Sequence, residues 1–236
     1  HSAIAAAHTQ CVQTLIGVKA ELCAVDKMGN TILHECAHHG RLEVLKYIVD
    51  LQNSAAVSSP SAVVSTSDST AKTTATTTVE GPGMGDQWLT ELSQMRDAVG
   101  QLPIHAAAVS GHSNVLHYLL SKQHLQEQGI LDSTDSTGCT PLHLAAVKGH
   151  EQCVRLLVTN RADIERRTSP APGRTPLLCA AGMGKRQVVQ ALIDLRANVD
   201  ARGPHNQTAA ELLAKFESKP KNIGGHRGRR TAASPQ

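Results

Sequence analysis

The chain has 236 residues, of which 40% are hydrophobic but only 2% are aromatic, and it carries a formal net charge of +3. So few large rings exclude a conventional globular core packed around aromatic side chains. No apolar run is long enough to span a membrane, no signal peptide is visible, and the six cysteines lack C-x-x-C spacing, so we expect a reducing compartment, either the cytoplasm or the nucleus.

The first part of the chain contains a partial and a complete helical unit. Residues 1–25 include one predicted helix, Val12 to Val18, and the start at His1 leads us to expect missing sequence upstream. In the complete unit, Asp26 opens a turn, Thr31 caps a helix and Gly40 ends it. Leu42 to Ile48 then repeats an apolar stripe at helical spacing.

The composition changes after this unit. From Asn53 to Gly85 the chain is rich in Ser, Thr, Ala, Gly and Pro, so it cannot bury enough surface to offset its ordering entropy. We expect residues 52–96 to form a disordered insert that ends in a short amphipathic helix, with Trp88, Leu92 and Met95 on one side. Trp88 either packs against the neighbouring helices or anchors a partner, and the hydroxyl-rich stretch is either a phosphorylation region or an unregulated expansion.

The clearest unit covers residues 138–160. Thr140 can cap a helix, Pro141 suits its first position, and Gly149 can end it in the left-handed conformation. Small residues on this helix allow a second helix, with its own apolar stripe, to approach closely. The unit is therefore a turn, a helix, a short loop and a second helix.

The same pattern recurs along the chain with a base period of 33. Successive equivalent positions are 33, 71, 38, 35 and 33 residues apart. They are His1, His34, His105, His143, Leu178 and Glu211. A fixed period of this length is typical of repeat proteins.

In this period and in its Thr-Pro-Leu-His-x-Ala pattern, the chain resembles the ankyrin-repeat family. Local departures are Ile32 for proline, Leu102 for threonine, Leu178 for histidine, Asn206 for the turn glycine, and Ala7 for the helix-ending glycine. The resemblance implies an all-α ankyrin-repeat solenoid of stacked helix pairs with projecting turn tips. Repeats are expected over residues 1–51 and 97–217, with the first one truncated.

Residues 218–236 are predicted to be a disordered basic tail. From Lys215 to Gln236 the net charge is +5, which leaves −2 for the rest of the chain. The tail is either a solvated terminus or a nuclear-import or nucleic-acid segment.

Candidate chemical sites are explained by the repeat. His34, Cys36, His38 and His39 resemble metal ligands, but the first two fall at repeat positions, and we expect no metal site or cofactor. Gly182 to Lys185 lacks the full phosphate-loop pattern. Cys139 and His143 are close in sequence, but no motif supplies an acid, so we expect no catalysis and no small-molecule substrate.

The resemblance implies that a partner contacts the turn tips and the two residues before each helix-ending glycine. The corresponding positions are Lys27, Met28, Asn30, His38, His39, Ala98, Val99, Gln101, Val109, Ser110, Ser136, Thr137, Cys139, Val147, Lys148, Arg174, Gly182 and Met183. Nearby arginines and lysines either favour an acidic partner segment or are ordinary solvated surface charge. These are Arg161, Arg166, Arg167, Arg174, Lys185 and Arg186.

The sequence thus predicts a monomeric scaffold or adaptor that binds a partner protein and has no membrane role. Two alternatives remain open at this point. The chain is the regulatory or substrate-recruiting portion of a larger enzyme truncated at His1, or it associates with nucleic acid through its basic tail.

Overall fold

The computed structural model describes residues 24–57, 89, 91–121 and 129–218. The partial first repeat, Trp88, most of the predicted insert and the basic tail lie outside these residues. No β-strand is assigned within the described ranges, which agrees with the predicted all-α solenoid.

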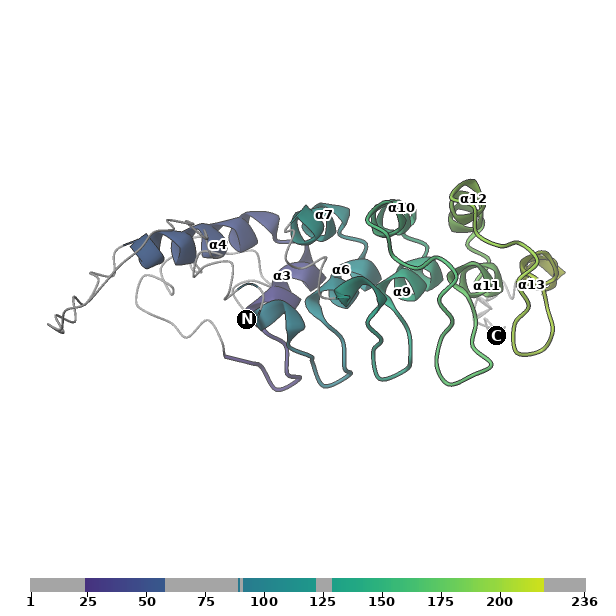
Figure 1. Cartoon of the computed structure of the whole chain (residues 1–236), viewed down its shortest axis with the longest axis horizontal. Coiled ribbons are helices and arrows are strands. Elements are labelled where there is room, and N and C mark those ends of the chain that lie inside the picture. The colour runs from purple at the N-terminus through teal and green to yellow at the C-terminus, as the bar shows by residue number, and fades with distance from the viewer. Residues whose placement is uncertain (1–23, 58–88, 90, 122–128, 219–236) are drawn as a thin grey trace, which may run out of the picture.

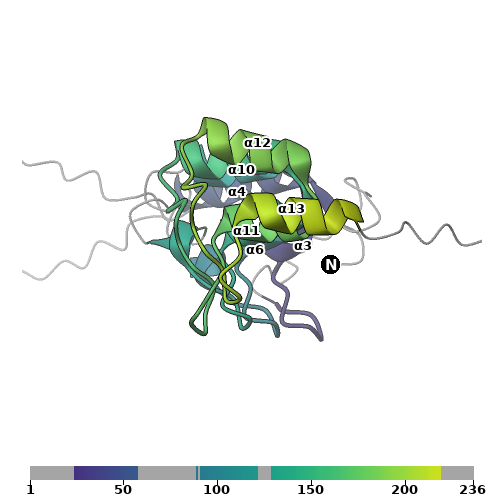
Figure 2. The same ribbon diagram turned by 90° about the vertical axis from the view of Figure 1, so that its right-hand side faces the viewer.

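The helices form two parallel rows, with the turns projecting beyond the inner row (Figures 1 and 2). The inner row consists of α3 (Ile32–His39), α6 (Pro103–Ser110), α9 (Pro141–Lys148), α11 (Pro176–Gly182) and α13 (Ala209–Ser218). The outer row consists of α4 (Leu42–Val57), α7 (Ser113–Ser121), α10 (Glu151–Thr159) and α12 (Arg186–Asp194). A short 3₁₀ helix, η1 (Ile130–Asp132), precedes the turn that leads into α9.

Helix α4 continues to Val57, beyond the boundary at residue 51 that composition indicated. Before α6, residues 89 and 91–94 are helical. Leu89 and Leu92 are buried, whereas Met95, which was expected on the same side as Leu92, is 38% exposed. Met95 differs because it follows the helical residues rather than lying within them.

Small side chains allow the inner helices to pack closely. Ala107, Ala145 and Ala180 are fully buried, so neighbouring helices approach without large rings between them. Cys36 and Cys153 are free thiols in the same core, and burial raises the pKa of Cys36 to about 12. These two cysteines act as small hydrophobic residues, as predicted.

A buried histidine connects each of three inner helices to the following repeat. In α9, His143 Nδ1 accepts from the Thr140 backbone N–H (3.3 Å), while Nε2 donates to the Arg174 carbonyl oxygen (2.9 Å). His34 and His105 make the same kind of pair, donating to the carbonyls of Gln101 (3.0 Å) and Ser133 (3.1 Å). These partners require the neutral tautomer with the proton on Nε2.

The departures from the repeat pattern have local effects. Leu102 supplies no side-chain acceptor, but His105 Nδ1 still accepts from the Leu102 N–H (3.2 Å). Leu178 is fully buried and lies near Gly203 of the last turn, where it cannot supply the hydrogen bond that a histidine makes in the other repeats. Asn206 adopts the left-handed conformation (φ 57°), which asparagine tolerates better than most residues.

Burial lowers the pKa of His34, His105 and His143, and the pKa of His105 falls to about 4. The charge of Asp135 raises the pKa of His105, and the charge of Arg96 lowers it. Between about pH 6.5 and pH 4 the unfolded chain therefore binds protons that the folded chain does not. We expect the free energy of unfolding to decrease as the pH is lowered through this window. The titration of His105 accounts for at most about 3 kcal/mol of that decrease.

Urea unfolding followed by circular dichroism between pH 7.5 and pH 5 checks this expectation. The variant His105→Gln should show a weaker pH dependence, because glutamine can accept at the cap without titrating. Equal midpoints at both pH values in the parent chain would contradict the expectation.

Candidate functional site

All the predicted partner-binding residues lie in the described part of the chain, and none of them is buried. They fall on the turn tips and at the C-terminal ends of the inner helices, which together form one side of the stack. We call this surface, which comprises the turns and the inner helices, the inner face. Among the predicted residues, Met28, Val99 and Met183 are large, apolar and 56%, 42% and 50% exposed.

Neighbouring turns are joined directly through their backbones. The Ala98 N–H donates to the Met28 carbonyl (2.8 Å), and the Ser136 N–H donates to the Val99 carbonyl (3.1 Å). In the next pair of turns, the Ser169 N–H donates to the Gly138 carbonyl (3.1 Å). These bonds fix the spacing of the turn tips, so the inner face is formed before any partner binds.

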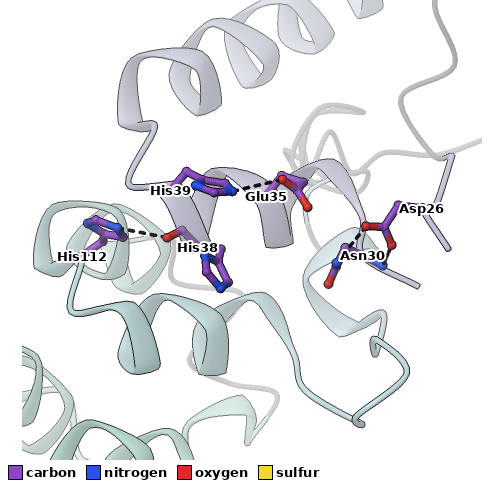
Figure 3. Close-up of polar contacts among 6 residues, drawn as sticks. All are labelled: Asp26, Asn30, Glu35, His38, His39 and His112. Atoms are coloured by element: carbon purple, nitrogen blue, oxygen red, sulfur yellow. Dashed lines mark hydrogen bonds and ion pairs between the residues drawn. The ribbon is translucent and has the colours of Figure 1, made fainter. Parts of the chain in front are cut away.

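An aspartate organises each of the first three described turns. Asp26, Asp97 and Asp135 each accept from two backbone N–H groups of the same turn through Oδ1. The Asn30 side chain donates to Asp26 Oδ2 (2.9 Å; Figure 3), and the Thr137 hydroxyl donates to Asp135 Oδ1 (2.6 Å). The side chains of these two predicted contact residues therefore also support their own turns.

His38 and His39 lie side by side at the end of α3, with ring centroids 5.1 Å apart. His39 Nε2 is 3.5 Å from Glu35 Oε2, and His38 contributes its carbonyl oxygen to a bond from His112 (Figure 3). Among the described residues, no three His, Cys, Asp or Glu side chains form a group that could hold a metal ion. The His38 side chain is exposed and so faces solvent or a partner.

A second pair of histidines, which sequence reasoning missed, links repeats in the opposite direction. His112 Nε2 donates to the His38 carbonyl (3.1 Å), and His150 Nε2 donates to the Val109 carbonyl (2.9 Å). Each ring lies against the helix-ending glycine of the preceding repeat, Gly40 or Gly111. The Gly-His pairs at 111–112 and 149–150 were the available sequence signal.

Cys139 and His143 do not form a nucleophile and base pair. Nδ1 of His143 is hydrogen-bonded to the backbone N–H and the hydroxyl of Thr140, and Nε2 donates to the backbone carbonyl oxygen of Arg174. Burial raises the pKa of Cys139, which favours the unreactive thiol over the thiolate. The structure therefore gives both residues a place in the repeat scaffold.

Some of the positive charge predicted for the C-terminal half has partners within the fold. Arg167 Nη1 donates to the carbonyls of Gly173 (3.0 Å) and Arg202 (2.9 Å), which belong to neighbouring turns. Arg186 forms an ion pair with Glu217. By contrast, the Arg174 guanidinium has neither an ion pair nor a hydrogen bond among the described residues, and it lies close to Gly182.

Family comparisons agree with this architecture. A family model described as ankyrin repeats in three copies matches residues 86–168 and 105–203. A second model, described as ankyrin repeats in many copies, matches residues 1–49. A search of curated proteins finds no match to the chain. No helix in the described part of the chain is both long and apolar enough to cross a membrane.

Two glycines at the C-terminal ends of inner helices should respond differently to alanine. Gly111 has a φ of +78°, and an added β-carbon would lie 2.5 Å from His150 Nδ1. We expect Gly111→Ala to destabilise the fold by about 2 kcal/mol, from backbone strain and a displaced His150. Gly182 is helical without positive φ, so Gly182→Ala should be neutral or stabilising by up to about 1 kcal/mol.

Urea unfolding of the two variants, measured side by side, tests this difference. Equal destabilisation by both substitutions would show that the packing of His150 against Gly111 contributes little.

Proposed function

Because the chain belongs to the ankyrin-repeat family, whose repeats are generally protein-interaction modules, we propose that it is a non-catalytic scaffold or adaptor. A partner protein binds on the inner face, at the turn tips and helix ends. The main support is the set of backbone bonds between neighbouring turns, because they hold variable side chains on a scaffold that does not need to be ordered on binding.

The composition of the inner face fits this role. Exposed apolar side chains at Met28, Val99 and Met183 supply area that a partner can bury, and polar residues lie between them. In the middle of the face, Val147 and Lys148 are the last two residues of α9, and neither is buried. Residues in such central positions are the usual energetic anchors of an interface.

The experiment is a pull-down from native lysate with the full chain as bait and quantitative mass spectrometry as readout. The test variant combines His38→Ala, Val147→Glu and Lys148→Glu. His39 is left unchanged, because its contact with Glu35 belongs to α3 itself. The matched control is Gln152→Glu with Gln187→Glu, which adds negative charge at exposed positions of the outer helices α10 and α12.

We expect the test variant to lose its partners by about tenfold or more, since truncation of a central contact typically costs 1–2 kcal/mol. The control should retain them, and circular dichroism should show both variants folded. If the test variant captures the same partners in the same amounts, the inner face is not the binding surface.

A further inference from the structure

An open pocket lies at the C-terminal end of the inner face, between α11, the last turn and α13. Its volume is about 500 Å³, within the range of ligand-binding pockets. The polar lining residues are Arg174, His205, Gln207 and Lys215, and the apolar ones are Leu212 and Phe216. Gly182, at the end of α11, completes the lining.

The pocket is open partly because one repeat lacks a side chain that the others carry. The residue two positions before the helix-ending glycine is His38, Val109 or Val147 in the earlier repeats but Gly182 in this one. A β-carbon at position 182 would lie 3.4 Å from Arg174 Nη1. The glycine therefore leaves the guanidinium accessible from the inner face.

The charged groups of the lining are both positive. They are the Arg174 guanidinium and the Lys215 ammonium, with no carboxylate among the described lining residues. The nearest acids of α13 are engaged elsewhere: Glu211 accepts from the Thr208 N–H (3.2 Å), and Glu217 pairs with Arg186. Within the described chain, the Arg174 and Lys215 side chains have no acidic partner of their own.

The rest of the lining includes two apolar side chains, both from α13. Leu212 is half-buried, and Phe216 remains 45% exposed although its ring lies against Gly184. The cations and the exposed aromatic ring present two different kinds of contact within one pocket. Carboxylates suit the cations, and aliphatic or aromatic side chains suit the ring.

We propose that this pocket binds an acidic peptide segment of the partner. A carboxylate of the peptide contacts Arg174 and Lys215, and a neighbouring apolar side chain packs on Leu212 and Phe216. A nucleic acid fits less well, because it needs basic side chains spread along a face, whereas the pocket holds two of them, Arg174 and Lys215, beside the apolar Leu212 and Phe216. This inference rests on the proposed protein-binding function and adds the chemistry of the partner.

The test begins with selection of a random displayed peptide library on the full chain. Enriched peptides are then measured by fluorescence anisotropy against the parent chain and three variants, Arg174→Gln, Lys215→Gln and Gly182→Val. The valine variant fills the pocket with the side chain that Val109 and Val147 carry in other repeats. The control, Lys46→Gln, removes one positive charge on α4, at the other end of the stack.

We expect the enriched peptides to pair an acidic residue with an apolar one. Each pocket variant should weaken their binding by about tenfold, the loss typical of a hydrogen bond to a charged group, while Lys46→Gln leaves it unchanged. Replacing the peptide carboxylate by its amide should cause a similar loss. Thermal unfolding of each variant verifies that the fold is intact.

Other results would overturn the inference. Enriched peptides without an acid, or unchanged binding by the pocket variants, would remove the pocket from the recognition site. A labelled oligothymidine that binds the parent chain and is lost with Arg174→Gln would assign the pocket to nucleic acid instead. If no peptide is enriched but the lysate partners still depend on the inner face, the pocket proposal fails and the protein-binding function stands; if neither binds, both fail.

Discussion

The stack depends on a hydrogen bond that crosses from one repeat to the next. In three repeats a buried imidazole accepts from the cap of its own inner helix and donates to a carbonyl oxygen of the following repeat. This arrangement satisfies backbone groups that would otherwise be buried without a partner at a cost of about 1–3 kcal/mol each. It also fixes the position of each inner helix relative to the next turn. His112 and His150 add bonds in the opposite direction, so neighbouring repeats are joined at both ends of the inner helix.

A scaffold held in this way separates stability from recognition. The three cap histidines His34, His105 and His143, the helix caps and the small alanines are buried, whereas the positions at turn tips and before the helix-ending glycines are not. Substitutions at the exposed positions leave the buried bonds intact, so the chemistry of the inner face can vary from repeat to repeat. The pocket at Gly182 illustrates this variation. One missing side chain, together with Phe216 from the last helix, changes the local surface.

Period and residue type were sufficient to predict the fold. The caps at Thr140 and Thr175, the buried histidines and the buried Cys36 follow from the repeat pattern, because each is decided by contacts within a unit or with its neighbour. Other features depend on side-chain reach, which a sequence does not specify. The contact of Arg167 with two neighbouring turns and the pocket beside Arg174 both require knowing where a long, flexible side chain ends. The continuation of α4 to Val57 was missed because composition there resembles that of a loop.

The central claim is that the inner face exists before a partner arrives, and hydrogen exchange of individual amides measures this directly. The amides of Ala98, Ser136 and Ser169, which bridge neighbouring turns, report on the spacing of the turn tips. If the turns are fixed, these amides should exchange in the unbound chain at least about a thousandfold more slowly than in an unfolded peptide, because exchange requires the repeats to separate. Exchange within about tenfold of the unfolded rate would contradict the account, since the turn tips would then become ordered only on binding.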